Sequence, residues 1–147
     1  MITFEVLGNP ISSKNAIRSG MTKSGRNYTY TLKAVKDYRD SALSQLAQNT
    51  RHATSKGNAD IFRIAYTTDE EQVAIRLPIT QPVQVSFIFY CKDNRKRDLI
   101  NLCQCPADLL QQSGIIQNDY LIINLDGSRI MEVDKLNPRT IINITIL

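Results

Sequence analysis

The spacing of apolar side chains changes period along this chain, and that change limits the folds open to it. Residues 2–7 and 140–147 alternate between apolar and polar, whereas apolar residues between 31 and 48 recur every three or four positions. Alternation is typical of a strand with one buried face, and the longer period is typical of an amphipathic helix. The predicted fold class is therefore α/β (α+β).

Applied to the whole chain, the same periods predict an order of elements. Strands are expected at residues 2–7, 82–89, 121–125 and 140–147, and helices at residues 31–48 and 98–112. Residues 130–133 are expected to form a hairpin with 121–125 across the turn Asp126-Gly127. Residues 9–30 are expected to be a polar loop. This order favours a single mixed β-sheet flanked by helices, in one domain spanning residues 1–147.

Two segments allow alternatives. Residues 61–66 and 72–77 are either the strands of a hairpin around 67–71 or an irregular excursion; both versions make 50–81 an elongated insertion in the domain. Pro106 lies inside the second helix, where proline removes a hydrogen bond and crowds the preceding turn. Either that helix is kinked, or its regular part begins near Pro106.

Composition excludes several classes of protein. Apolar residues make up 42% of the chain and charged residues 22%, as in a globular domain. No apolar run is long enough for a membrane span, and no secretory signal precedes residue 8, so a cytoplasmic protein is expected. One histidine, His52, and three cysteines without Cys-x-x-Cys spacing argue against a zinc site and against Ser-His-Asp catalysis.

Positive charge is concentrated in the first part of the chain. Residues 1–57 hold nine Lys and Arg against three acidic residues, although the whole chain carries only +4. Two clusters are candidate DNA contacts: Lys14, Arg18, Lys23 and Arg26 in the first, and Lys92, Arg95, Lys96 and Arg97 in the second. Such cations neutralise phosphates and release counterions. A solvated surface with no polyanionic partner explains the charge equally well.

Acidic residues follow the second cluster directly. Asp98 comes after Lys96-Arg97, and Asp119 follows Asn118 beyond the predicted helix and Gly114. Carboxylates beside cations are what a Mg²⁺-dependent nuclease needs, because the carboxylates hold the metal and the cations hold the phosphate backbone. Simpler roles compete: Asp98 can cap the helix, and Asn118-Asp119 can be an ordinary turn.

The ordered set of motifs resembles the RusA family of Holliday-junction resolvases. The family pattern is Asp-Leu-Asp-Asn-Leu-x-Lys, then Asp-Ala-Leu, Gly and Asp-Asp; here Asp98-Leu-Ile-Asn-Leu is followed by Asp108-Leu-Leu, Gly114 and Asn118-Asp119. The intervals fit without a gap, with ten residues from Asp98 to Asp108 and twenty-one from Asp98 to Asp119. The opening Gly8-Asn9-Pro10 is also similar to the family's.

The resemblance implies a homodimeric endodeoxyribonuclease that cuts branched DNA, such as four-way junctions, with Mg²⁺ as cofactor and Mn²⁺ as a substitute. It implies Asp98 and Asp119 as catalytic metal ligands, with Asn118 where the family often has another Asp. Asn101, Gln104 and Asp108 fall at supporting positions. Family habit also suggests a prophage or viral origin.

Two departures from the family pattern matter for the chemistry. Ile100 stands at the second Asp and has no oxygen for a metal, and Gln104 stands at the motif lysine and brings no positive charge. Impaired or absent cleavage with DNA binding retained is the resulting hypothesis. A neighbouring cation, or Asp93 or Asn101, is a candidate replacement for the lost groups.

Distance limits how the two aspartates can meet. A straight helix over 99–112 is about 20 Å long, and residues 113–118 span about 20 Å when extended. Convergence of Asp98 and Asp119 in one chain is therefore tight, unless a kink at Pro106 shortens the path or a dimer assembles the site. Three functions stay open: a nuclease, a branched-DNA-binding module, and a structural protein whose acids are only caps.

Overall fold

A mixed sheet forms the centre of the protein. The computed structural model describes residues 1–14, 16–54, 61–68 and 72–147. The sheet runs in the order β1 (Ile2–Leu7), β10 (Arg139–Ile146), β7 (Val83–Tyr90) and β8 (Ile122–Asn124), and β9 (Arg129–Ile130) also pairs with β7. β10 is antiparallel to both neighbours, whereas β8 and β9 are parallel to β7. The predicted class, helices with a mixed sheet, is confirmed.

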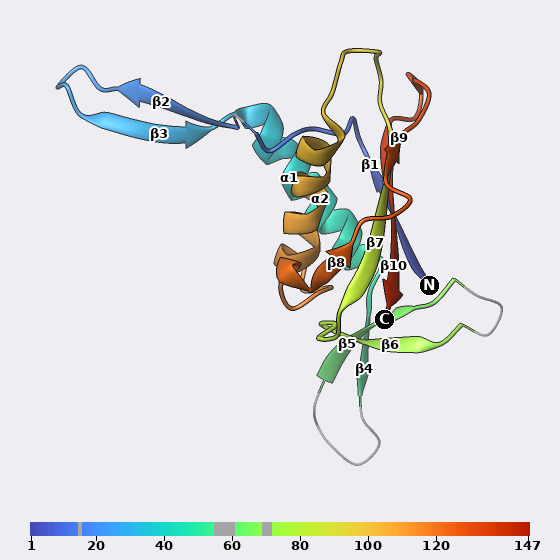
Figure 1. Cartoon of the computed structure of the whole chain (residues 1–147). Helices are drawn as coiled ribbons and strands as arrows, with labels where there is room; N and C mark the ends of the chain where they lie inside the picture. The colour runs from blue at the N-terminus through green and yellow to red at the C-terminus, as the bar shows by residue number, and fades with distance from the viewer. Residues whose placement is uncertain (15, 55–60, 69–71) are drawn as a thin grey trace.

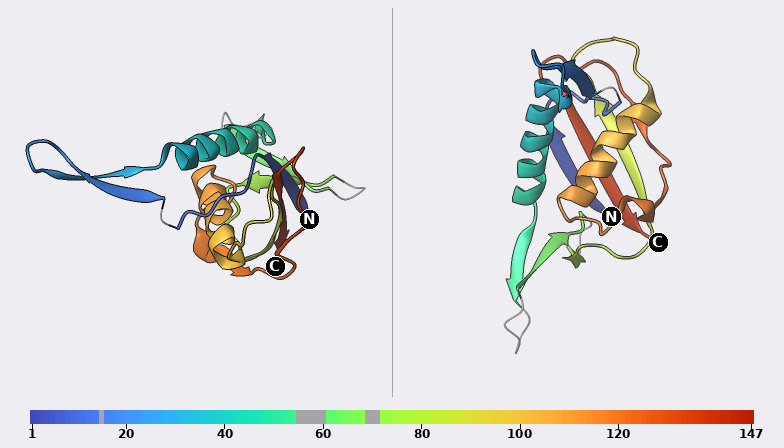
Figure 2. Two further views of the ribbon diagram at one scale, coloured as in Figure 1. Left: turned by 90° about the horizontal axis from the view of Figure 1, so that it is seen from above. Right: turned by 90° about the vertical axis from the view of Figure 1, so that its left-hand side faces the viewer.

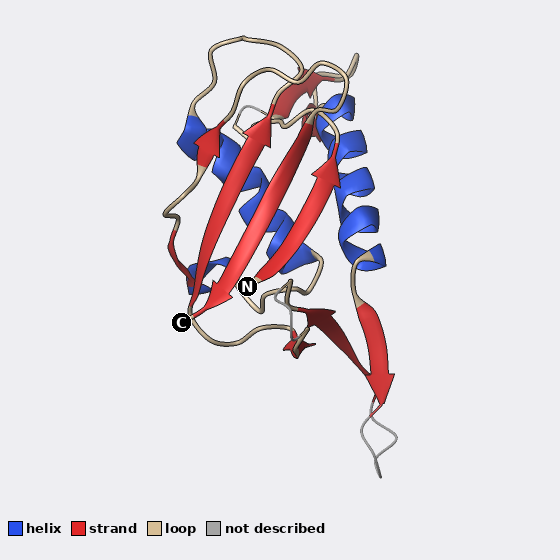
Figure 3. Cartoon of the chain, turned by 90° about the vertical axis from the view of Figure 1, so that its right-hand side faces the viewer, coloured by secondary structure: helices blue, strands red, loops and turns tan. Residues whose placement is uncertain are grey.

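Two helices cover one face of this sheet. α1 (Lys33–Gln48) and α2 (Leu99–Gln112) lie side by side behind the strands in Figure 3. The register aligns Phe4, Ile142 and Phe87 in one row across three strands, and all three are buried. Burial of such large apolar side chains supplies most of the drive to fold. Among the described residues, neither helix has the length and apolar character needed to cross a membrane.

α2 begins and ends where the sequence predicts. Asp98 is its N-cap, and beyond Ser113 the chain turns through Gly114, whose φ of +69° is favourable for glycine. The helix is continuous from Leu99, so a regular start near Pro106 is wrong. Pro106 is one of the buried residues of α2, and its missing N–H costs a single hydrogen bond.

The segment predicted as a polar loop contains a hairpin instead. β2 (Ile17–Met21) and β3 (Asn27–Thr31) pair antiparallel and project away from the body as an arm (Figures 1 and 2). Every residue of the two strands is exposed except Gly20, which is half-buried. Because neither face of the hairpin is buried, β2 lacks the apolar alternation by which strands are found, and on β3 only the two tyrosines alternate with polar residues.

The end of the sheet also differs from the expectation. Residues 129–130 do not form a hairpin with β8; both segments lie parallel to β7, beside its start and its end respectively. A turn at Gly127, with φ +85°, separates them, and the Ser128 hydroxyl accepts a hydrogen bond of 3.0 Å from Phe87 N–H there. The long β7 strand thus offers one edge to two short strands, which local patterns do not reveal.

Residues 50–81 contribute a small antiparallel sheet. It consists of β4 (Arg51–Thr54), β5 (Ile61–Tyr66) and β6 (Ala74–Leu77). The hairpin alternative for 61–66 and 72–77 is therefore confirmed, although positions 69–71 of its turn lie outside the described residues. Treating this segment as an insertion in a single domain stays a prediction.

Candidate nucleic-acid interface

Asp98 starts α2 and still presents an open carboxylate. Its Oδ1 accepts hydrogen bonds from the N–H groups of Ile100 (2.9 Å) and Asn101 (3.3 Å). Both bonds go to the same oxygen, and within the described part of the chain Oδ2 accepts none. The side chain is exposed. Capping and binding a cation are therefore compatible roles for this residue.

The loop before Asp98 is held by an internal ion pair. The Arg97 guanidinium donates to Asp93 Oδ1 at 2.5 Å and to the carbonyl oxygens of Asp93 and Arg95 at 2.9 and 3.0 Å. The bond from Arg97 lowers the pKa of the Asp93 carboxyl below its ordinary value. Only 15% of the Arg97 side chain is exposed. Asp93 is thus engaged in shaping the loop, which makes it a poor replacement for a lost metal ligand.

An open pocket of about 500 Å³ lies at the N-terminal end of α2. Its walls come from three distant segments: residues 10–18, the start of α1, and residues 95–102. Of the described residues, five cations and one carboxylate, Asp98, line it; the cations are Lys14, Arg18, Arg95, Lys96 and Arg97. The fold therefore brings part of each sequence cluster together around Asp98, and a pocket of this charge attracts phosphates.

Three of the predicted DNA contacts lie outside this pocket. Lys23 and Arg26 belong to the turn that joins β2 to β3, at the tip of the arm in Figure 1. Lys92 is exposed in the loop after β7, where its backbone N–H donates to Asn9 Oδ1 at 2.9 Å. These cations can extend a polyanion-binding surface, but they do not surround Asp98.

Asn118 and Asp119 lie at the opposite end of α2. Asp119 begins the short 3₁₀ helix η1 (Asp119–Leu121), and its N–H donates to Gln111 Oε1 near the helix C-terminus at 3.0 Å. Asn118 caps η1 by accepting a bond of 3.2 Å from Tyr120 N–H. Because α2 separates the two ends by about 20 Å, one chain does not bring Asp98 and Asp119 together.

The supporting positions have different environments. Asp108 faces α1, where Arg39 Nη2 lies 3.9 Å from its carboxylate, so it helps to join the two helices. Asn101 lines the pocket beside Asp98. Gln104 is exposed, and so is Ile100, which has 73% of its residue surface open to solvent. The described residues contain no cluster of three acidic, histidine or cysteine side chains able to hold a metal.

Most of the chain matches a known protein family. The family model described as endodeoxyribonuclease RusA matches residues 8–145, which include the pocket and both ends of α2. The chain belongs to the RusA endodeoxyribonuclease family. A search of curated proteins found no match. Ile100 and Gln104, the two positions where a carboxylate and a cation are expected from the sequence, are exposed on the outer side of α2.

The sequence patterns did not indicate several residues that help to build this interface. Pro10, Ile11 and Ser12 line the pocket from the segment after β1. The arm carries exposed Tyr28 and Tyr30, one residue apart on β3. Alternation of tyrosine with small polar residues over 27–31, following Gly25, was the available signal for this hairpin.

Substitutions of Asp98 separate its cap from its charge. Asp98→Ala is expected to lower the free energy of unfolding by about 1 kcal/mol, since the cap is lost. Asp98→Asn keeps an oxygen for Ile100 and Asn101 and is expected to retain wild-type stability. Urea denaturation of both variants measures this difference. Equal stability of all three proteins would show that the cap contributes nothing.

Proposed function

We propose that this protein is a homodimeric, Mg²⁺-dependent endodeoxyribonuclease that acts on branched DNA, with four-way junctions as its main substrate. Family membership supports the nuclease class. The observation that carries the proposal is the convergence of two cationic segments around the exposed Asp98 in one pocket. Such a site unites the phosphate-binding groups and the carboxylate that phosphodiester hydrolysis needs.

The cations of the pocket have different tasks in this proposal. Lys14 and Arg18 approach from the N-terminal segment, and Lys96 from the loop before α2, so they hold phosphates from two sides. Arg95 lies 3.6 Å from Asp93 Oδ2, but 81% of its side chain is exposed, so it is accessible to the DNA backbone. Arg97 is the exception, since its bonds to Asp93 position the loop. Phosphate contacts of this kind supply affinity without base specificity.

The metal donors fit Mg²⁺ in chemistry but not in distance within one protomer. Mg²⁺ usually takes one or two carboxylates and completes its shell with water and substrate phosphate. Asp98 and Asp119 are both exposed, with Asn118 beside the second. When bound, the metal would activate water and offset charge on the phosphate, and Mn²⁺ would serve in its place.

A symmetric dimer removes the distance problem. Two α2 helices that pack antiparallel about a twofold axis bring the N-terminal end of one helix to the C-terminal end of the other. Asp98 of one protomer then lies near Asp119 of its partner. The outer stripe of α2, Ile100, Gln104 and Gln111, is exposed at intervals of about one or two turns and offers a surface for this pairing.

A second candidate is a branched-DNA-binding protein with impaired cleavage. Ile100 cannot ligate a metal, and Gln104 brings no charge to the transition state. Asp93, the nearest other carboxylate in the loop, is paired with Arg97. Binding through the pocket needs none of these missing groups, so it would persist where cutting is weak.

Junction binding and cleavage test the proposal directly. The wild-type protein is expected to bind a synthetic four-way junction more tightly than linear duplex, and to nick it only with Mg²⁺ or Mn²⁺. Replacing both Lys14 and Arg18 with Ala is expected to lower the slope of log affinity against log salt by about 2, one for each lost phosphate contact.

Lys33→Ala is the matched control for this experiment. Lys33 is an exposed cation whose ammonium is paired with Asp37 at 2.5 Å, and it does not line the pocket. It is expected to leave the salt slope unchanged. Equal effects of the pocket and control variants would contradict the assignment of the pocket to DNA. Preferred binding without nicks in either metal would favour the second candidate.

Mixed dimers test whether the carboxylates act across the interface. Asp98→Asn and Asp119→Asn are each expected to abolish nicking. After random exchange about half of the dimers are mixed, and each mixed dimer has one intact site out of two. Nicking is therefore expected to return to about a quarter of the wild-type rate. Nicking assays after subunit exchange measure this. If nicking does not recover although mass spectrometry verifies subunit exchange, Asp98 and Asp119 do not form one site across the interface.

Restoring the family residues tests whether Ile100 and Gln104 weaken cleavage. The double variant Ile100→Asp with Gln104→Lys regains a carboxylate and a cation on α2, and is expected to nick junctions faster than the wild type. The matched control is Ile100→Asn with Gln104→Met, which keeps similar size without either charge. A folded double variant that binds junctions but shows no gain would contradict this explanation.

A further inference from the structure

The β2–β3 arm exposes aromatic side chains far from the core. Its strands pair from Ile17 with Thr31 to Met21 with Asn27, and it joins the body where Leu32 N–H donates to Ala16 O at 2.8 Å. Tyr28 and Tyr30 remain 48% and 47% exposed. A two-stranded hairpin is only marginally stable in water alone. Large apolar surface on such an arm therefore points to a partner.

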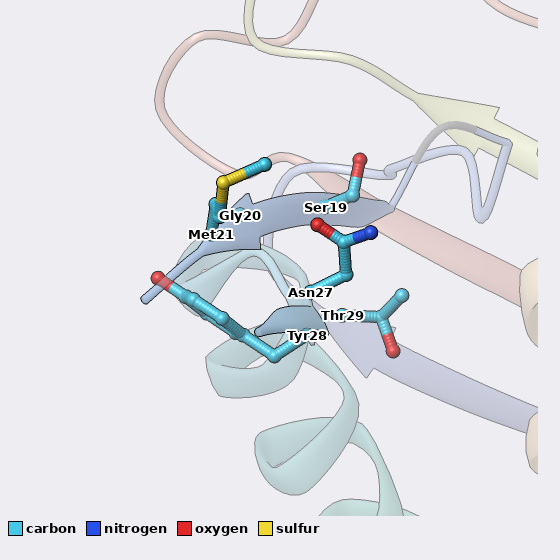
Figure 4. Close-up of a pocket in the computed structure, with 6 residues that line it drawn as sticks. All are labelled: Ser19, Gly20, Met21, Asn27, Tyr28 and Thr29. Carbon is cyan, nitrogen blue, oxygen red and sulfur yellow. The ribbon is translucent and has the colours of Figure 1, made fainter. Parts of the chain in front are cut away.

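A glycine determines how the Tyr28 ring is held. Tyr28 is directly opposite Gly20, and a Cβ built on Gly20 would lie 2.7 Å from Tyr28 Cζ. The ring thus rests on the bare backbone of β2, as Figure 4 shows for Tyr28 reaching toward Gly20 and Met21. The Tyr30 ring follows at 5.9 Å between centroids. Two neighbouring rings with an open side form a strip on which flat groups can stack.

The charge of the arm identifies the kind of partner. No Asp or Glu occurs between Glu5 and Asp37, and the arm carries Arg18, Lys23 and Arg26. A second copy of this strongly basic arm would be repelled, whereas a polyanion would be attracted. Proteins commonly bind unstacked nucleotides with aromatic rings placed beside cationic side chains. Arg18 also lines the cationic pocket, so the two surfaces are continuous.

We propose that the arm is a base-stacking platform, on which Tyr28 stacks against a base unpaired or unstacked at the branch point of the DNA. Gly20 is a positioning residue, because only glycine lets the ring lie across β2. This inference rests on the proposed action on branched DNA and adds the part of the substrate that the arm recognises. Lys23 and Arg26 hold the flanking phosphates.

Affinity for three DNAs tests the platform: a junction with unpaired thymines at its branch point, linear duplex, and oligothymidylate. Tyr28→Ala is expected to bind the junction and oligothymidylate about tenfold more weakly, with duplex affinity unchanged, because duplex offers no free base. Tyr28→Phe keeps the ring and is expected to match the wild type. Gly20→Ala displaces the ring and is expected to fall between them.

Met21→Ala is the matched control on the same arm. Met21 is 68% exposed and neighbours Gly20, so its truncation removes apolar area without removing a ring. It is expected to bind all three DNAs like the wild type. Circular dichroism and thermal melting verify that each variant is folded.

Several outcomes would overturn the platform. Equal losses on junction and duplex for Tyr28→Ala, no loss at all, or an equal loss for Met21→Ala would each do so. Conversion of a dimer to a monomer by Tyr28→Ala in light scattering would assign the strip to a second copy. If the wild type shows no preference for junctions, the proposed function is contradicted rather than the platform. In that case the platform is tested by oligothymidylate alone: weaker binding by Tyr28→Ala supports it, and unchanged binding overturns it.

Discussion

The hydrogen bonds from two backbone amides to Asp98 Oδ1 determine where α2 begins, and most of the site follows from that start. They hold the carboxylate at the rim of the cationic pocket, with its second oxygen open. They also set the length of helix that lies between Asp98 and Asp119. The same cap that stabilises the helix therefore defines both the chemistry at one end and the separation from the other.

That separation distinguishes a binding site from a complete catalytic site. One protomer can gather phosphates around Asp98, because five cations from distant segments meet there. It cannot gather the two carboxylates, because a rigid helix keeps them apart. In the proposed mechanism, cleavage therefore needs a second protomer to bring the two carboxylates together, whereas binding of the DNA backbone does not.

The pocket and the arm divide recognition into two parts. In the proposed complex, the pocket binds phosphates without regard to sequence, while the arm stacks against bases that have left the helix. The arm is attached at buried Ala16, immediately between the pocket residues Lys14 and Arg18. A contact on one surface therefore positions DNA for the other.

Most of the core was predictable from the sequence, and most of the arm was not. The alternation in β1, β7 and β10 and the longer period in α1 and α2 record which faces are buried, and burial is what hydrophobic patterns report. Neither face of the β2–β3 hairpin is buried, so no hydrophobic pattern marks its two strands together. β9 was assigned to the wrong neighbour because pairing direction depends on where β7 has a free edge, which is a property of the assembled sheet.

The amino-acid sequence was sufficient for the local features: the Asp98 cap, the glycine stop after α2, the order of motifs and the presence of two cationic clusters. These depend on hydrogen bonds and spacings within a few residues. Only the tertiary structure decided that both clusters reach one pocket, that Asp119 lies a helix length from Asp98, and that Tyr28 rests on Gly20. Such meetings depend on strand register and helix packing between distant segments, for which the linear order of residues carries no direct signal.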